Sequence, residues 1–436
     1  MQNKIHTCQD YKFIFFICKI FAMEKAIAVI DMKAFYAFEE CVERNLNPFT
    51  TPLVVCDPTR GKSTIVLSVT PYLKSLGVPS RCRRSDLPSI EGMIFAQPRM
   101  EHYVKKSAEI ISIVTDIIGE DDLHVYSIDE FFVNLGPYLK MYECTPYQLV
   151  RKIQKTITDK TGLVTTAGLS YNMLMAKVAL DTDAKNRPPY IANWTKKDVQ
   201  NKLWKIKPLS KMWGISVGYE TKLNALGIND VGQLAKTDKN FLKQKFGVMG
   251  EQLWEHANGI DNTDIRKKYI PKDTSLSLGQ VLYKDYNVNE ARLIIKEMSD
   301  DLCMRLREHQ KLTQTIGLAV GYSNDGYCSF SHHVTLDYPS DDTETITNDL
   351  MKIYDKYVEN KPIRRIYLSF GKLSGNEHRQ ISLFDDEETI SEKRALTKVM
   401  DVLKIKYGKN IVLRGSSLLK ESTAKERHNQ IGGHHR

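Results

Sequence analysis

The chain has 436 residues, of which 42% are hydrophobic, so it can hold roughly two to four domains with sizeable cores and is neither a disordered nor a fibrous protein. Its formal net charge of +9 favours a polyanionic partner such as nucleic acid, although a balance of this size also fits simple solubility. The eight cysteines are scattered without a C-x-x-C pair, which indicates a reduced, intracellular protein with no zinc site.

The N-terminus carries an apolar run, "FIFFICKIFAM", from Phe13 to Met23. Lys19 interrupts this run, which is shorter than the roughly 20 apolar residues needed to cross a bilayer, and no small-residue cleavage pattern follows it. We therefore expect Met23 to be the natural start and residues 1–22 to be an upstream extension or a poorly ordered leader. No other run reaches transmembrane length, so we expect a cytoplasmic protein without a membrane partner.

The next segment alternates between strand and helix patterns. Predicted strands cover 25–32, 52–57, 123–128, 131–135 and 163–170, and predicted helices cover 34–46, 99–118, 146–160 and 172–185. Strand, helix, strand, strand, helix, strand is the ferredoxin-like order, here with an insertion after the first strand. This order places Asp31 on a strand beside the one that carries Asp129 and Glu130.

A lysine-rich segment, Thr195–Trp213, leads into "GISVG", which lies between two predicted short helices. Gly214, Ser216 and Gly218 of this loop fit a helix-hairpin-helix, whose main-chain N–H groups receive a DNA phosphate at a helix N-terminus. An ordinary helical hairpin with glycine caps is the alternative, and the surrounding lysines favour the phosphate interpretation.

The last third of the chain predicts a second α+β domain of ordinary size. An exposed basic linker, Arg266–Asp273, precedes it, and helices alternate with strands up to about residue 373. From Asp385 onwards we expect a tail with one amphipathic helix. Its polar end, Lys420–Arg436, has the composition of a disordered segment.

The pair Asp129 and Glu130 stands out because it interrupts an apolar, strand-like stretch, "VYSIDEFFVNL". Adjacent residues on a strand point to opposite faces, so both can serve one site only at a strand end or turn. With Asp31 they form three carboxylates without His or Cys, a set of hard oxygen ligands suited to Mg²⁺. Salt bridges to nearby lysine or arginine are an equal alternative on spacing alone.

Five motifs in order resemble a Y-family DNA polymerase, most of all the UmuC-like branch of translesion polymerases. They are "DMKAFYAFEE" from Asp31, "SVTPYLKSLGV" from Ser68, "VYSIDEFF" from Val125, "AGLSYNMLMAKVA" from Ala167 and "GISVG" from Gly214. The resemblance runs from about Lys25 to Phe384, and it is specific as a set although no single motif is.

The resemblance implies a metal-binding role for the carboxylates. Asp31 and Asp129 would hold two Mg²⁺ ions, for which Mn²⁺ can substitute, and Met32 would offer its main-chain carbonyl. Glu130 would bind the ion nearest the primer 3′-hydroxyl. These three carboxylates would be the catalytic residues.

The resemblance also implies a nucleotide site on the helix after Asp31. Tyr36 would be the steric gate that excludes a 2′-hydroxyl, and Phe35 would pack beside the triphosphate. Plain core packing is the alternative for both rings. Glu40 on the same helix matches a family glutamate for which we expect a structural role.

Three further residues match the family's triphosphate contacts. Lys74 and Lys185 would reach the phosphates, and Ser68 would donate its hydroxyl. The chain departs from the DinB-like pattern at Pro71, where that pattern has a tyrosine, and proline offers no donor. The spacing between Lys177 and Lys185 is also one residue longer than in that pattern.

"QISLF", from Gln380 to Phe384, resembles the peptide that binds the bacterial sliding clamp (its beta subunit). Gln380, Leu383 and Phe384 would fill the pocket on the clamp. The end of a packed strand is the alternative, and the position after the last domain favours the clamp interpretation.

The whole resemblance implies an α+β, right-hand-like polymerase that adds deoxynucleotides to a primer in DNA damage tolerance and the SOS response. Primer-template DNA, deoxynucleoside triphosphates, the clamp and an accessory subunit would be its partners. We expect these parts: palm, 23–35 and 99–190; fingers, 36–98; thumb, 191–265; linker, 266–273; little finger, 274–384; tail, 385–436. A nucleotidyl cyclase-like enzyme and an inactive DNA- and clamp-binding accessory are the alternatives.

Overall fold

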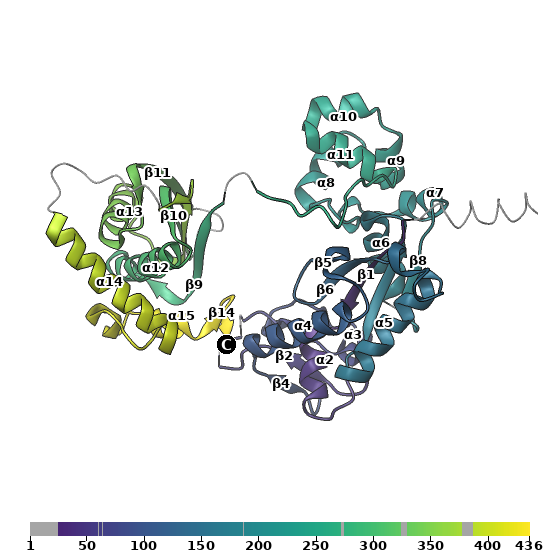
Figure 1. Cartoon of the computed structure of the whole chain (residues 1–436), viewed down its shortest axis with the longest axis horizontal. Helices are drawn as coiled ribbons and strands as arrows, with labels where there is room; N and C mark the ends of the chain where they lie inside the picture. The colour runs from purple at the N-terminus through teal and green to yellow at the C-terminus, as the bar shows by residue number, and fades with distance from the viewer. Residues whose placement is uncertain are drawn as a thin grey trace, which may run out of the picture. The chain divides into compact units, whose positions relative to one another are not determined.

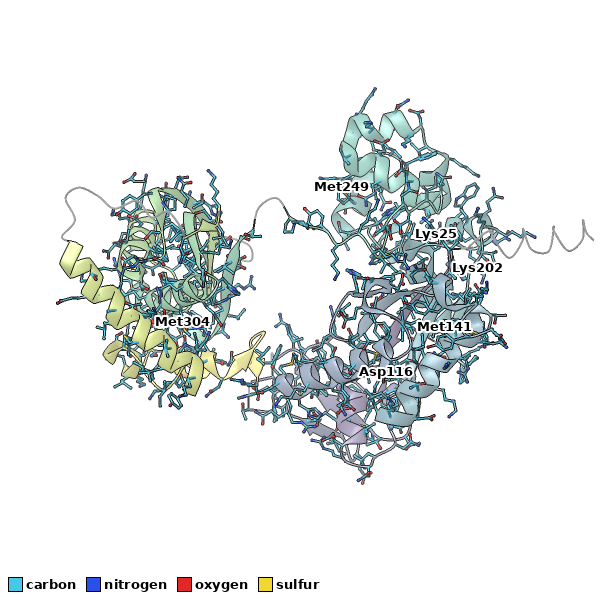
Figure 2. All side chains as sticks on the ribbon, in the orientation of Figure 1. Lys25, Asp116, Met141, Lys202, Met249 and Met304 are labelled. Carbon is cyan, nitrogen blue, oxygen red and sulfur yellow. The ribbon has the colours of Figure 1, made fainter. Side chains whose placement is uncertain are left out.

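The computed structural model describes residues 25–59, 61–62, 64–185, 187–271, 274–323, 329–376 and 387–436. Figure 1 traces the chain and Figure 2 adds its side chains. The chain divides into two compact units, one ending at Lys268 and the other beginning at Tyr269. Tyr269 and Ile270 are 86% and 85% exposed at this junction, as a linker requires. The predicted leader, residues 1–22, lies outside the described residues.

A five-stranded sheet of order β5-β6-β1-β7-β8 organises the first unit. Its strands are β1 (Ile27–Met32), β5 (Leu123–Val125), β6 (Glu130–Asn134), β7 (Thr165–Ser170) and β8 (Ile191–Asn193). β1 runs antiparallel to both β6 and β7, with Asp31 opposite Glu130 on one side and Thr166 on the other. The order of β5, β6, β1 and β7 is the predicted ferredoxin-like order, and β8 extends its edge.

Both faces of this sheet are covered, which explains the continuous apolar run of β1. Ala28 and Ile30 pack in one core with α2 (Phe35–Val42), α4 (Met100–Thr115) and α5 (Pro146–Thr161). Ile27 and Val29 point to the opposite face and pack with α6 (Met173–Ala179). Asp31 is the first polar side chain of the strand, so it lies where the covered part of the sheet ends.

The insertion between β1 and α4 forms a small three-stranded sheet of order β3-β2-β4 with its own core. Its elements are β2 (Leu53–Val55), β3 (Ser68–Val69), α3 (Pro71–Ser75) and β4 (Ile94–Ala96). The predicted strand at 52–57 therefore belongs to this insertion and not to the central sheet.

Short helices follow β8 and share the α6 core. They are α7 (Asp198–Asn201), α8 (Val217–Asn224), α9 (Val231–Lys236), α10 (Lys239–Phe246) and α11 (Val248–Ala257). "GISVG" joins α8 to a single 3-10 turn at Leu209–Lys211. The first of the two helices predicted around this loop is thus only one turn long, because Pro208 and the short spacing to Gly214 leave no room for more.

The second unit contains a five-stranded sheet, in which β11, β10, β12 and β9 are neighbours in that order, with two helices packed on one face. Its main elements are β9 (Leu276–Tyr286), α12 (Val288–Glu308), β10 (Lys311–Tyr322), β11 (Ser329–Ser340), α13 (Thr343–Tyr357) and β12 (Ile363–Gly371), and β13 (Ser374–Gly375) pairs with β10. β9 was not predicted, because it is an edge strand with few buried residues and its sequence mixes glycine and charge with the apolar positions.

The C-terminal tail is folded, and the predicted disorder of Lys420–Arg436 is wrong. Beyond α14 (Glu387–Tyr407) lie α15 (Ala424–His428) and a hairpin of β14 (Gln430–Ile431) and β15 (His434–His435). Arg427 and His428 of the tail bind Asp301 of α12 at 2.9 Å and 2.8 Å. Composition indicated disorder because the tail is held by buried ion pairs and not by apolar residues.

The two longest helices, α12 and α14, have 21 residues each and carry charges along their length. Across the ranges that the structure describes, no helix combines the length and apolarity that crossing a membrane requires.

Candidate active site

The three predicted carboxylates meet at one end of the central sheet. Asp31 and Glu130 are register partners on β1 and β6, and the Met32 N–H donates to the Asp129 carbonyl at 2.8 Å. Asp129 lies in the turn before β6, where the Ser127 hydroxyl donates to its carboxylate at 2.7 Å. A turn residue followed by the first strand residue is the arrangement in which adjacent carboxylates can share a site.

Two of these carboxylates also face lysines. Lys177 of α6 is buried, donates to Glu130 Oε2 at 2.9 Å and lies equally close to Oε1, and it is 3.2 Å from Asp181 Oδ2. Lys185 Nζ lies 3.5 Å from Asp31 Oδ2. Both alternatives left open by the sequence, a carboxylate cluster and salt bridges, are therefore present in the same residues.

The cluster retains capacity for a cation. Glu130 Oε1 is buried and accepts no hydrogen bond of good geometry from the described residues. The three side chains do not bring three oxygens within 4.8 Å of one another, so they do not form a closed ligand shell by themselves. The donor set is all oxygen, which suits a hard divalent ion that retains water ligands.

The surroundings of the cluster disfavour the ionised forms of two of its carboxylates, Asp31 and Glu130. Burial, with the negative charge of Asp129, raises the pKa of Asp31 against the opposing effect of Lys185. Burial likewise raises the pKa of Glu130, although its hydrogen bond from Lys177 acts the other way. Each shift means that the protein alone does not fully stabilise the ionised carboxylates, and a bound cation would supply what is missing.

Lys33, Lys74 and Lys185 are close enough to Asp31 for their charges to affect one another. Burial and the like charge of Lys74 lower the pKa of Lys33, and burial and Lys185 lower that of Lys74, with Asp31 opposing both effects. The Lys33 ammonium donates to the Lys185 carbonyl at 2.8 Å. Like charges held this close favour binding of a polyanion such as a triphosphate.

Lys185 reaches Asp31 because the helix before it contains a π-turn. The π-turn, Leu180–Ala184, follows α6 directly and accommodates the extra residue between Lys177 and Lys185. Asp181 binds Lys177 at 3.2 Å and Lys185 at 2.8 Å, so the two lysines share one carboxylate. The longer spacing noted in the sequence is thus absorbed locally.

The aromatic pair at the start of α2 divides between core and site. Phe35 is buried in the core, whereas Tyr36 is partly exposed and stacks on Tyr103 with ring centroids 4.5 Å apart. Burial and the charge of Asp129 raise the pKa of Tyr36, so its hydroxyl lies within electrostatic reach of the carboxylates. Glu40 is buried and accepts from the Tyr103 hydroxyl at 2.7 Å, which fits its expected structural role.

The remaining predicted contacts with the nucleotide lie near this turn. Ser68 is buried and its hydroxyl donates to the Ala34 carbonyl at 3.3 Å, so the local main chain already uses it. Pro71 occupies the first turn of α3, where a missing N–H carries no penalty, and Lys74 lies in the last turn of that helix.

The predicted DNA-binding loop is exposed at Gly214, Ser216 and Gly218. Ser216 caps α8 by accepting the Tyr219 N–H at 3.4 Å, and Gly214 has a φ of 90° that favours glycine. The loop therefore has the geometry of a capped helix start, which both interpretations of "GISVG" require. The predicted clamp-binding residues, Gln380, Leu383 and Phe384, lie outside the described residues.

Lys33, Lys177 and Tyr103 were not among the predicted site residues. Lys33 directly follows the Asp31 motif, and Lys177 is the lone charge in the apolar helix "MLMAKVA". Both features were visible signals, since a charged residue in an apolar helix is rarely buried without a partner. Tyr103 gave no signal of its own because its role depends on packing between α2 and α4.

Comparison with known proteins gives matches in both units. The impB/mucB/samB family matches residues 30–181, and the impB/mucB/samB family C-terminal domain matches residues 274–383. The putative UV-damage repair protein UvrX of Bacillus subtilis is 35% identical over 94% of this chain and 97% of its own length. DNA polymerase IV 2 of the same species is 30% identical over 95% and 99%, and DNA polymerase IV of Clostridium acetobutylicum is 28% identical over 92% and 100%.

Proposed function

The chain belongs to the impB/mucB/samB family of Y-family DNA polymerases, and we propose that Asp31, Asp129 and Glu130 are its catalytic carboxylates. It is a DNA-directed DNA polymerase of the translesion type, which uses DNA and deoxynucleoside triphosphates in DNA damage tolerance. The observation that carries the proposed site is the meeting of three carboxylates at one sheet end, two of them with a raised pKa.

Polymerases of this family generally depend on a divalent metal, and we propose two Mg²⁺ ions, with Mn²⁺ as a substitute. Asp31 and Asp129 would hold both ions, with the Met32 carbonyl as a further ligand, and Glu130 would hold the ion nearest the primer. Bound there, the ions would supply activation of the attacking oxygen and charge neutralisation at the leaving oxygen. Lys177 would keep Glu130 ionised and oriented in the absence of the ions.

The residues around the carboxylates would bind and orient the nucleotide. Lys74 and Lys185 would hold the triphosphate, and Lys33 adds a third positive charge beside them. Ser68 would turn its hydroxyl from the main chain to the phosphates. Tyr36 would meet the sugar and exclude a 2′-hydroxyl, with Phe35 packed behind it.

We assign the parts of the chain by the same reasoning. The palm would be 23–35 and 99–190, the fingers 36–98, the thumb 191–265, the linker 266–273 and the little finger 274–384. The loop with Gly214, Ser216 and Gly218 would bind DNA phosphates. Gln380, Leu383 and Phe384 would bind the sliding clamp. An accessory subunit and a cytoplasmic location complete the proposal.

Primer extension on a gapped template with Mg²⁺ tests the catalytic assignment. We expect Asp129→Ala to lower the extension rate on the order of 10³-fold, as loss of a strong electrostatic group at a transition state does. Asp116→Ala is the matched control, because Asp116 is exposed and its ion pair is with Lys160, which is exposed too. Undiminished extension by Asp129→Ala would contradict the assignment.

A further inference from the structure

A second group of potential metal ligands lies between α2 and α4. Glu39 is in the last turns of α2, Glu43 follows the helix one turn later, and His102 is in the first turn of α4. One ligand atom from each side chain lies within 4.8 Å of the other two. Within the described part of the chain, no other three His, Cys, Asp or Glu side chains bring ligand atoms this close together. None of the three takes part in the proposed polymerase site.

Glu39 is the unusual member because its side chain is fully buried. Its Oε1 lies 2.7 Å from His102 Nε2, and its Oε2 is buried without a hydrogen-bond partner in the described residues. Burial raises the pKa of Glu39, although the hydrogen bond with His102 acts in the opposite direction. A buried carboxylate with one oxygen unsatisfied is costly, and a cation that binds it would remove that cost.

The nearby basic side chains do not satisfy this group. Lys106 Nζ is 3.7 Å from Glu39 Oε1 but only 2.9 Å from Glu109 Oε2. Arg99 Nη1 is 3.8 Å from Glu43 Oε2, whereas its Nε is 2.8 Å from Glu40 Oε1. Each base thus has a closer partner outside the group, and neither lies within hydrogen-bond distance of Glu39 or Glu43.

We propose that Glu39, Glu43 and His102 bind one divalent first-row transition ion of the Zn²⁺ class. An imidazole nitrogen with two carboxylates is a common ligand set for such ions, and nitrogen disfavours Mg²⁺. Two carboxylates balance the charge of the ion, and the exposed side of Glu43 admits a water ligand. The ion would be structural, since it would join α2 to α4, the helices that carry Tyr36 and Tyr103.

Zinc titration of the full chain in excess Mg²⁺ tests this site, because Mg²⁺ occupies all-oxygen sites and leaves the histidine-containing one. We expect Glu43→Gln and His102→Gln each to bind one Zn²⁺ fewer than the wild type, or to bind it about 10–100-fold more weakly. Glu43 is largely exposed, so its substitution leaves the fold intact. Glu109→Gln is the matched control on the same face of α4 and should bind as the wild type does.

Co²⁺ in place of Zn²⁺ gives an independent readout through its visible absorption. We expect a band for the wild type and for Glu109→Gln that is lost in Glu43→Gln and His102→Gln. Equal Zn²⁺ stoichiometry and affinity in all four proteins would overturn the proposal, because binding would then reside on other histidines. Neither measurement uses polymerase activity, so the result stands apart from the assignment of Asp31, Asp129 and Glu130.

Discussion

Two groups of buried carboxylates in this chain face basic side chains, and their pKa values move in opposite directions. At the end of β1 and β6, burial raises the pKa of Asp31 and of Glu130 in spite of their lysines. On α12, burial also acts to raise the pKa of Asp300 and Asp301. There, hydrogen bonds and charge from the tail outweigh burial, and both pKa values fall below the ordinary range.

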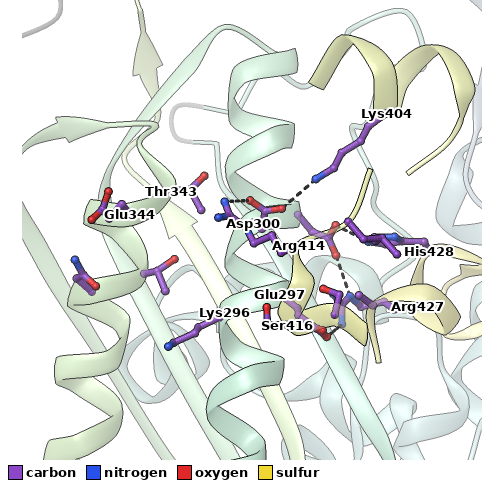
Figure 3. A pocket seen from close by; sticks show the side chains of 16 residues that line it. Lys296, Glu297, Asp300, Thr343, Glu344, Lys404, Arg414, Ser416, Arg427 and His428 are labelled. Carbon is purple, nitrogen blue, oxygen red and sulfur yellow. Dashed lines mark hydrogen bonds and ion pairs between the residues drawn. The ribbon is translucent and has the colours of Figure 1, made fainter. Parts of the chain in front are cut away.

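The difference lies in how completely the protein supplies the positive charge. Figure 3 shows Asp300 between Lys404 and Arg414. Arg427 and His428, the partners of Asp301, line the same cavity, which has a volume of about 360 Å³. At the β1–β6 end, Lys177 pairs with Glu130 and Lys185 lies 3.5 Å from Asp31, and both lysines also pair with Asp181. At the tail site the ion pairs outweigh burial and stabilise the charged carboxylates, whereas at the sheet end burial outweighs the lysines, as it does at a metal site.

The largest expected effect is on stability at the tail site. Asp301→Ala removes the carboxylate 2.9 Å from buried Arg427 and leaves Glu297, 3.7 Å away, as a more distant partner. Breaking a buried pair of this kind costs about 3–5 kcal/mol. We expect a lower melting temperature, measured calorimetrically on the full chain, with little change in primer extension. Lys393→Ala is the matched control, because it removes an exposed pair with Glu344, and exposed ion pairs contribute little to stability. Equal decreases in melting temperature for both variants would show that the buried ion pair contributes no more to stability than the exposed one.

A smaller effect is expected on nucleotide binding at the sheet end. Lys185→Ala removes a charge 3.5 Å from Asp31, and we expect the KM for deoxynucleoside triphosphates to rise about 10–100-fold, as for loss of a charged hydrogen bond. Lys202→Ala is the control: it also removes a lysine paired with an aspartate, but that aspartate is Asp183 and not Asp31. An unchanged KM for Lys185→Ala would remove this lysine from the phosphate site.

The sequence predicted the sheet-end site because its parts are local motifs on strands with clear patterns. β1 is an unbroken apolar run ending at Asp31, and Asp129 with Glu130 interrupts a second such run, so the strand order alone brings them together. The role of Lys185 at the phosphates stays a prediction; the structure places this lysine 3.5 Å from Asp31, directly after a π-turn. The family assignment on these motifs is confirmed by the matches in both units.

The tail and the α2–α4 group escaped prediction for a common reason. Arg427 and His428 lie more than a hundred residues from Asp301, and Glu39 lies 63 residues from His102. Their contacts join charged side chains that no periodic pattern marks as buried. Apolar periodicity identifies strands and helices, but a polar residue is assigned to the surface unless its distant partner is known.

The smallest expected effect is on the stability of variants in which one aspartate at each site, Asp31 or Asp301, is replaced by asparagine. Asp31 has a folded-state pKa above its unfolded value, so its contribution to stability is present below the unfolded pKa and is lost as pH rises through the folded pKa. In metal-free protein at neutral pH its charge therefore opposes folding. Asp301 has a folded-state pKa below its unfolded value, so its contribution is present at neutral pH and is lost on acidification.

Asp31→Asn should consequently stabilise the metal-free protein at neutral pH, while Asp301→Asn destabilises it. Thermal melts in a chelator at pH 7 measure both, and the gap between the variants should narrow as the pH is lowered towards 4. Adding Mg²⁺ should raise the melting temperature of the wild type more than that of Asp31→Asn, since the ion compensates the charge that asparagine lacks. Melting temperatures that change in the same direction for both variants would contradict the proposed difference, which is that the charge of Asp31 opposes folding and the charge of Asp301 favours it.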